Sequence, residues 1–219
     1  MRKIINKLSS FLFTISVMVL TITFSIGLPI YVRPFYYAHV EILDLDEQWD
    51  LEKEYIIEAY DEVLDFLTLE GREFGAGVLP FSEEGAGHFA DCKVLFDLNK
   101  NAFIVALIAF VSLLLLNKLG IIKLSRPRGY GLSYHAGLST LILFATIALL
   151  AAQNFSVAFT IFHLIFFPGK DNWLFDPNTD PIILFMPQKF FMNCAILICA
   201  SILIISIVLI ARGKKKRIK

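Results

Sequence analysis

Cysteine is scarce in this sequence, with three residues among 219. Cys194 and Cys199 share one apolar run and Cys92 stands apart, so the three form neither a disulfide framework nor a zinc cluster. Familiar catalytic motifs are missing too. There is no Gly-x-Ser-x-Gly, no His-Glu-x-x-His and no phosphate-binding loop, and no motif sets a serine or cysteine nucleophile beside a base. Any acyl chemistry would therefore need a nucleophile supplied by the substrate.

Long apolar runs are what the sequence has in excess. Hydrophobic residues make up 57% of it, with a mean hydropathy of +0.67, which is more than soluble domains carry. A helix that crosses a bilayer needs roughly 20 apolar residues, and four runs reach that length: 11–32, 102–122, 132–152 and 191–211. We predict an all-α membrane protein with four transmembrane helices and an extracellular cap. The first run exceeds the roughly 7 to 15 residues of a signal peptide, so we expect a retained anchor.

Acidic residues are absent from three of the segments that flank these runs. The N-terminus 1–10, the loop 123–131 with the adjoining Lys118, and the tail 212–219 hold 13 of the 20 Lys and Arg. All 20 Asp and Glu fall in 33–101 and 153–190, with the other seven basic residues. Because basic loops stay cytoplasmic, we predict a bacterial cell-membrane protein with both termini inside and these two segments outside. Basic flanks of this kind suit an anionic inner leaflet and do not indicate nucleic-acid binding.

The two outer segments have different patterns. In the cap, 33–101, an amphipathic helix is predicted over 50–70 from apolar residues spaced three and four apart, with Gly71 placed to end it. Its apolar stripe consists of Ile56, Ala59, Tyr60, Val63, Leu64 and Leu67. Ser82 caps a further predicted helix that continues into the second span. The segment 153–190 is rich in phenylalanine, which favours the outer membrane interface.

Two of the four histidines are candidates for chemistry. We expect supporting roles for His39 and His135, whereas His88 and His163 are both outer and both flanked by phenylalanine. An imidazole among aromatic rings loses hydration of its charged form, which favours the neutral base near pH 7. Asp91 follows His88 by three residues on the same helical face, where it would orient the imidazole or join His163 in binding a metal. A metal site lacks a third ligand at a familiar spacing. The pattern also fits two interfacial histidines without chemistry.

Several short strings, in this order and on the outer side of four spans, resemble the lipoprotein intramolecular transacylases of Gram-positive bacteria. The resemblance covers nearly the whole chain, apart from the local departures Gly85, Gly87 and Cys92. The strings are Phe81-Ser82-Glu83-Glu84, His88-Phe89-Ala90-Asp91, Phe162-His163, Asp171, Trp173-Leu174 and Asp176-Pro177.

The resemblance implies transfer of the sn-2 acyl chain of a diacylglyceryl lipoprotein to the α-amine of its own N-terminal cysteine. It implies His88 and His163 as the catalytic acid and base, with no cofactor or metal, and diacylglyceryl lipoproteins and the bilayer as partners. The transfer closes an eight-membered ring, so holding one substrate conformer should supply much of the catalysis. The residues expected to orient groups or bind substrate are Asp91, Arg33, Tyr36, Tyr37, Phe162, Phe166, Phe167 and Trp173.

Two other functions remain open from sequence. A non-enzymatic accessory protein would use the acidic cap to dock a basic partner, and both histidines would then be replaceable. A metal-dependent membrane hydrolase would bind zinc and lose activity with a chelator.

Overall fold

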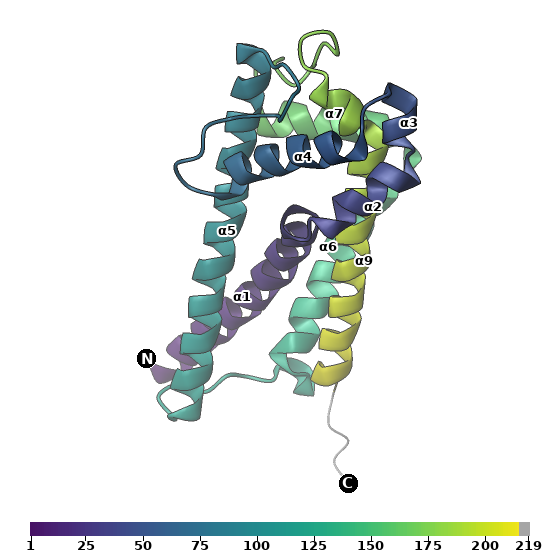
Figure 1. The fold of residues 1–219 in the computed structure, drawn as a ribbon. Helices are drawn as coiled ribbons and strands as arrows, with labels where there is room; N and C mark the ends of the chain where they lie inside the picture. The colour runs from purple at the N-terminus through teal and green to yellow at the C-terminus, as the bar shows by residue number, and fades with distance from the viewer. Residues whose placement is uncertain (215–219) are drawn as a thin grey trace. The chain divides into compact units, whose positions relative to one another are not determined.

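The computed structural model describes residues 1–214, and every regular element in that range is a helix (Figure 1). Four helices are long and apolar enough to cross a membrane: α1 (Arg2–Tyr31), α5 (Glu83–Lys118), α6 (Leu132–Gln153) and α9 (Gln188–Gly213). The shorter ones are α2 (Pro34–Ile42), α3 (Leu45–Trp49), α4 (Lys53–Thr68), the 3-10 turn η1 (Pro127–Gly129), α7 (Phe155–Phe166) and α8 (Ile182–Phe185). The predicted all-α class with four membrane-spanning helices is confirmed.

Contacts divide the chain into two compact units. The first, here the basic unit, comprises Met1–Gly27, Asn99–Leu149 and Leu197–Lys219, and the second, the acidic unit, comprises Leu28–Leu98 and Leu150–Ile196. All 20 Asp and Glu belong to the acidic unit, and 14 of the 20 Lys and Arg belong to the basic unit. The separation of charge along the sequence is thus also a separation between two structural units.

The core of the acidic unit forms around α4. The six apolar residues predicted to share one face of this helix are all buried, which confirms the predicted stripe. Tyr36 of α2 stacks on Tyr60 with ring centroids 3.6 Å apart, and its hydroxyl donates to the Phe185 carbonyl at 2.8 Å. Burial of each large side chain contributes roughly 1.5 to 3 kcal/mol, so this stripe holds α2, α4 and α8 together.

Helix α5 begins where the sequence predicts. The Ser82 hydroxyl accepts from the Gly85 amide at 2.9 Å, while the Ser82 amide and hydroxyl both donate to Asp180 at 2.8 Å. At about 1.5 Å per residue, the 36 residues of α5 extend well beyond the roughly 30 Å of a bilayer core. The part of this helix up to Leu98 belongs to the acidic unit and carries His88. The predicted continuity of this helix with the second span is confirmed.

Small residues allow close helix packing in the basic unit. A Cβ at Gly137 of α6 would lie 2.8 Å from the Ser206 carbonyl of α9, and a Cβ at Gly213 would collide with Tyr134. Figure 1 shows α6 and α9 side by side. The Gly131 amide also donates to the Gly213 carbonyl at 2.9 Å, which ties the start of α6 to the end of α9.

Candidate functional site

His88 and His163 lie next to one another in the acidic unit, although 75 positions separate them in the sequence. Their ring centroids are 5.8 Å apart with 30° between the planes, and the residues are only 5% and 6% exposed. His88 comes from the first turns of α5 and His163 from the last turn of α7. The Asn154 side chain caps α7 by accepting from the Val157 amide at 3.1 Å. Each histidine thus lies on a helix whose first turn is capped, by Ser82 in α5 and by Asn154 in α7.

Aromatic rings surround both imidazoles. Phe167 lies 5.0 Å from the His88 ring and 5.7 Å from the His163 ring, and Phe175 lies 5.5 Å from His88. Trp173 stacks on His163 at 4.4 Å. These rings exclude water from a site that contains two titratable groups, and such a site favours neutral imidazoles.

The protonation of His163 follows from its backbone contact. Its Nδ1 lies 2.7 Å from the Phe159 carbonyl oxygen, and a carbonyl can only accept, so Nδ1 carries the proton. Burial lowers the pKa of His163 below its ordinary value. The neutral tautomer thus presents an unprotonated Nε2, which is the form required of a general base.

His88 contacts a thiol. The Cys92 Sγ lies 3.4 Å from His88 Nε2, one helical turn further along α5. Sequence reasoning missed this contact, although burial raises the pKa of the Cys92 thiol to about 12 and so keeps it from acting as a nucleophile. The signal was the spacing of four residues between His88 and Cys92 on one helix, which places both side chains on the same face.

Two buried polar atoms at this site have no hydrogen-bond partner in the described part of the chain. They are His88 Nδ1 and the side-chain oxygen of Asn172. Leaving such atoms unpaired costs about 1 to 3 kcal/mol each, so they mark where a polar ligand or water gains most by binding.

Asp91 has partners other than the expected one. Its carboxylate accepts from the Lys170 ammonium and, at 3.2 Å, from the Asn172 amide, rather than from His88. It thereby fastens the loop after α7 to α5. Lys170 and Asn172 were not predicted as site residues, since no motif or periodicity in that loop distinguishes them.

The other predicted site residues divide into two groups. Phe162 lies 5.4 Å from the His163 ring, whereas Phe166 contacts Phe162 and is 48% exposed. Arg33 and Tyr37 belong to a separate cluster in the acidic unit. Arg33 forms ion pairs with Asp61, at 3.0 Å, and Asp65, and the Tyr37 hydroxyl donates to Asp61 at 2.8 Å.

Tyr36 also lies in the core of the acidic unit rather than beside the histidines. Burial raises its pKa, so its hydroxyl stays protonated and donates to the Phe185 carbonyl. Among residues 1–214, no group of three or more His, Cys, Asp and Glu is arranged to hold a metal ion.

The sequence matches the family described as lipoprotein intramolecular transacylase Lit over residues 11–191. The chain belongs to the lipoprotein intramolecular transacylase family. It is similar to the solved structure of the membrane-integral Lit from Bacillus cereus, with 26% identity and a TM-score of 0.85 over 95% of this chain and 94% of that one.

Two further structures of the Bacillus cereus transacylase carry a histidine replaced by arginine or by alanine. Each is 24% identical, with a TM-score of 0.79, over 95% of this chain and 90% or 91% of the other. No curated protein matches the chain. The chain is thus a multi-pass membrane transacylase, which agrees with its four apolar helices.

Proposed function

We propose that this transacylase moves the sn-2 acyl chain of a diacylglyceryl lipoprotein to the α-amine of its own N-terminal cysteine, using His88 and His163 as acid and base. The observation that carries the proposal is the pair of buried imidazoles, 5.8 Å apart, within aromatic walls. A transfer from oxygen to nitrogen moves one proton off the amine and one onto the departing glyceryl oxygen. Two adjacent imidazoles meet both requirements.

The contacts of the two rings favour different roles. His163 has an unprotonated Nε2 because its Nδ1 donates to the Phe159 carbonyl, so it takes the proton from the attacking amine. The Cys92 thiol donates to Nε2 of His88 in the tautomer that leaves Nδ1 protonated. His88 then directs its Nδ1 proton, on the side that lacks a partner, toward the departing glyceryl oxygen, and the proton that His163 took from the amine replaces it, so both imidazoles return to the neutral form.

Confinement supplies the other part of catalysis. The amine and the ester carbonyl belong to one substrate molecule and meet only in a folded conformer, because the ring they close has eight members. Well-oriented intramolecular reactions recover roughly 7 to 11 kcal/mol of the barrier. Trp173, Phe167 and Phe162 line the imidazoles and would restrict the diacylglyceryl group to that conformer. Arg33, Tyr36 and Tyr37 have no chemical role in this mechanism, because their contacts hold the acidic unit together.

We also propose that the acidic unit, and with it the histidine pair, faces the outside of the cell. Support comes from the absence of Asp and Glu in the basic unit, since basic ends of spans remain cytoplasmic. A single cysteine introduced at Asp50 or Asp171 should react with an impermeant thiol reagent on intact cells. One introduced at Arg126 should react only after lysis, and labelling there on intact cells would contradict the orientation.

The reaction is tested by single and double alanine variants of the histidines. Each variant is expressed in a host that makes only diacyl lipoproteins, and the N-terminal lipopeptide is examined by mass spectrometry. His88→Ala and His163→Ala should each lower formation of the N-acylated lyso form by about 10² to 10⁴. If both act in one proton-transfer cycle, the double variant should be little worse than the worse single one.

Matched controls come from the same two helices. Val94→Ala on α5 and Leu164→Ala on α7 remove side chains that are 66% and 58% exposed, and they should keep wild-type activity at equal membrane levels. Wild-type product from either histidine variant would overturn the mechanism. If the unaltered protein gave no lyso form, the result would favour the non-enzymatic accessory function. If a chelator abolished the activity, the result would favour the metal-dependent hydrolase.

A further inference from the structure

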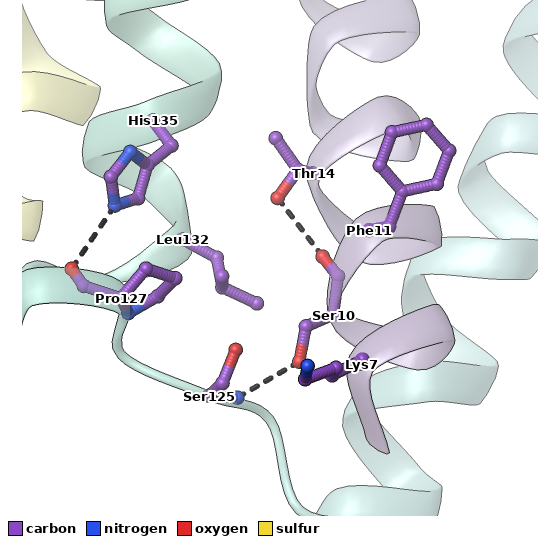
Figure 2. Close-up of a pocket in the computed structure, with 8 residues that line it drawn as sticks. All are labelled: Lys7, Ser10, Phe11, Thr14, Ser125, Pro127, Leu132 and His135. Atoms are coloured by element: carbon purple, nitrogen blue, oxygen red, sulfur yellow. Dashed lines mark hydrogen bonds between the residues drawn. The ribbon is translucent and has the colours of Figure 1, made fainter. Parts of the chain in front are cut away.

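The basic unit contains a hollow of about 300 Å³ that the transacylase reaction does not involve (Figure 2). One wall is a single face of α1, where the lining residues recur at intervals of three and four. The opposite walls are the loop before α6 and the first turn of α6. The lining residues are Lys7, Ser10, Phe11, Thr14, Ser125, Pro127, Leu132 and His135.

Hydrogen bonds hold these walls in place. The Ser125 amide donates to the Ser10 hydroxyl oxygen at 2.9 Å, and the Lys123 amide donates to the Asn6 side chain at 2.9 Å, which fastens the loop to α1 at two points. The His135 Nε2 donates to the Pro127 carbonyl at 3.3 Å. Figure 2 shows the first and last of these bonds bordering the hollow. The hollow is therefore preformed, as ligand sites usually are.

The electrostatics of the hollow select an anion. Lys7 lies at one end of the α1 face, and the sequence of the whole basic unit contains no Asp or Glu. A negative group at this position would meet no carboxylate side chain of its own unit. Arg126 and Arg128 flank the lining residues of the loop and add to the positive potential there.

The rest of the lining selects an acyl chain. From Lys7 to Thr14 the face of α1 advances about 10 Å along the helix axis, from a charged residue into an apolar span. Phe11 is 62% exposed on this helix, and Leu132 is buried opposite. A soluble anion would use only the charged end, whereas a lipid uses both ends.

We propose that this hollow binds one anionic phospholipid, with its phosphate at Lys7 and Ser125 and an acyl chain along Phe11 and Leu132. Basic pockets between membrane helices are suited to anionic headgroups, and each lysine near the membrane surface adds about 1 kcal/mol of attraction. The site lies entirely within the basic unit and does not depend on the proposed acyl transfer.

The test measures thermal unfolding of the purified full-length protein in detergent during titration with phosphatidylglycerol. Phosphatidylcholine with the same acyl chains and inorganic phosphate serve as the other two probes. A lipid that binds only the folded protein raises the melting temperature with concentration. Phosphatidylglycerol should raise it to saturation, and the other two should have little effect.

Three variants locate the site. Lys7→Gln should weaken the apparent affinity for phosphatidylglycerol about fivefold. Thr14→Phe keeps the charge but fills the hollow, so the shift should disappear. Lys118→Gln, the matched control, removes the same charge from an exposed position outside the hollow and should leave the affinity unchanged.

Each other result would overturn the proposal. Equal shifts with phosphatidylcholine would mean that the headgroup charge is not recognised, and equal shifts with inorganic phosphate would assign the site to a free anion. Equal losses in Lys7→Gln and Lys118→Gln would indicate diffuse surface attraction. A retained shift in Thr14→Phe would place the lipid elsewhere.

Discussion

Asp180 is the residue whose replacement should most clearly connect stability with activity in this protein. It is 3% exposed and lies at the end of the loop that follows α7. Its carboxylate accepts from the Ser82 amide and hydroxyl, both at 2.8 Å, and from the Thr179 hydroxyl at 2.7 Å. Ser82 in turn caps α5, so Asp180 joins the loop that carries Trp173 to the helix that carries His88.

The size of the effect follows from these bonds. Asp180→Ala leaves the Ser82 amide and hydroxyl without their acceptor, and each unsatisfied donor costs about 1 to 3 kcal/mol. Ser82 is half-buried, so water recovers part of this cost, and the expected loss is about 2 to 4 kcal/mol. For a chain of this size, that lowers the melting temperature by about 5 to 15 °C. Asp180→Asn keeps one acceptor oxygen and should lose about half as much.

The assay combines thermal unfolding in detergent with the yield of lyso-form lipopeptide below the melting temperature. Asp180→Ala should reduce the yield at least about tenfold, because small displacements of a catalytic group are costly. Asp171→Ala, in the same loop but exposed, is the matched control and should match wild type in both measurements. If Asp180→Ala had the same melting temperature as the control and kept full activity, the proposed role of Asp180 in joining this loop to the helix of His88 would be refuted.

Two further predictions concern the walls of the site. Trp173→Ala should lower the rate of acyl transfer about ten- to hundredfold at unchanged membrane level, since it removes the ring stacked on His163, whereas Phe166→Ala should have a smaller effect. Equal rates for both variants in single-turnover assays would assign Trp173 to anchoring instead. Cys92→Ala should keep the activity within about tenfold of wild type, and the unaltered protein should carry no acyl group on Cys92, because partial burial raises the pKa of this thiol to about 12 and the substrate amine is the nucleophile. An acylated Cys92 in the mass spectrum of the intact protein would show a covalent route.

The fold could be predicted from the sequence because membrane helices obey a strong physical constraint. Backbone polar groups in a bilayer must be paired within the segment, so apolar runs of sufficient length form helices. The apolar stripe of α4 could be predicted equally well, because a helix with one buried face carries apolar residues three and four positions apart. The extent of α5 followed from Ser82, whose side chain indicates a helix start.

Only part of the site could be predicted from the sequence, because its other contacts are not under such a constraint. His88 and His163 stood out as rare polar residues among aromatics, and the fold brings their rings together. The contacts of Asp91 depend instead on how a distant loop folds back, since Lys170 and Asn172 lie 79 and 81 positions further along the chain. Such loops have no periodicity, and one sequence does not specify which of their polar side chains meet.

Gly85 has a role in the packing of the site that the sequence alone does not indicate. In the sequence it is a weak helix former near His88 and a departure from the family resemblance. In the structure it is buried, and a Cβ would run into the Asp180 carboxylate and lie 3.1 Å from the Phe175 ring. The absence of a side chain lets Asp180 reach the Ser82 amide at the start of α5, and it leaves Phe175 room beside His88. The cost of one glycine in the first turn of a helix, at most about 1 kcal/mol, is smaller than the value of the contacts it permits.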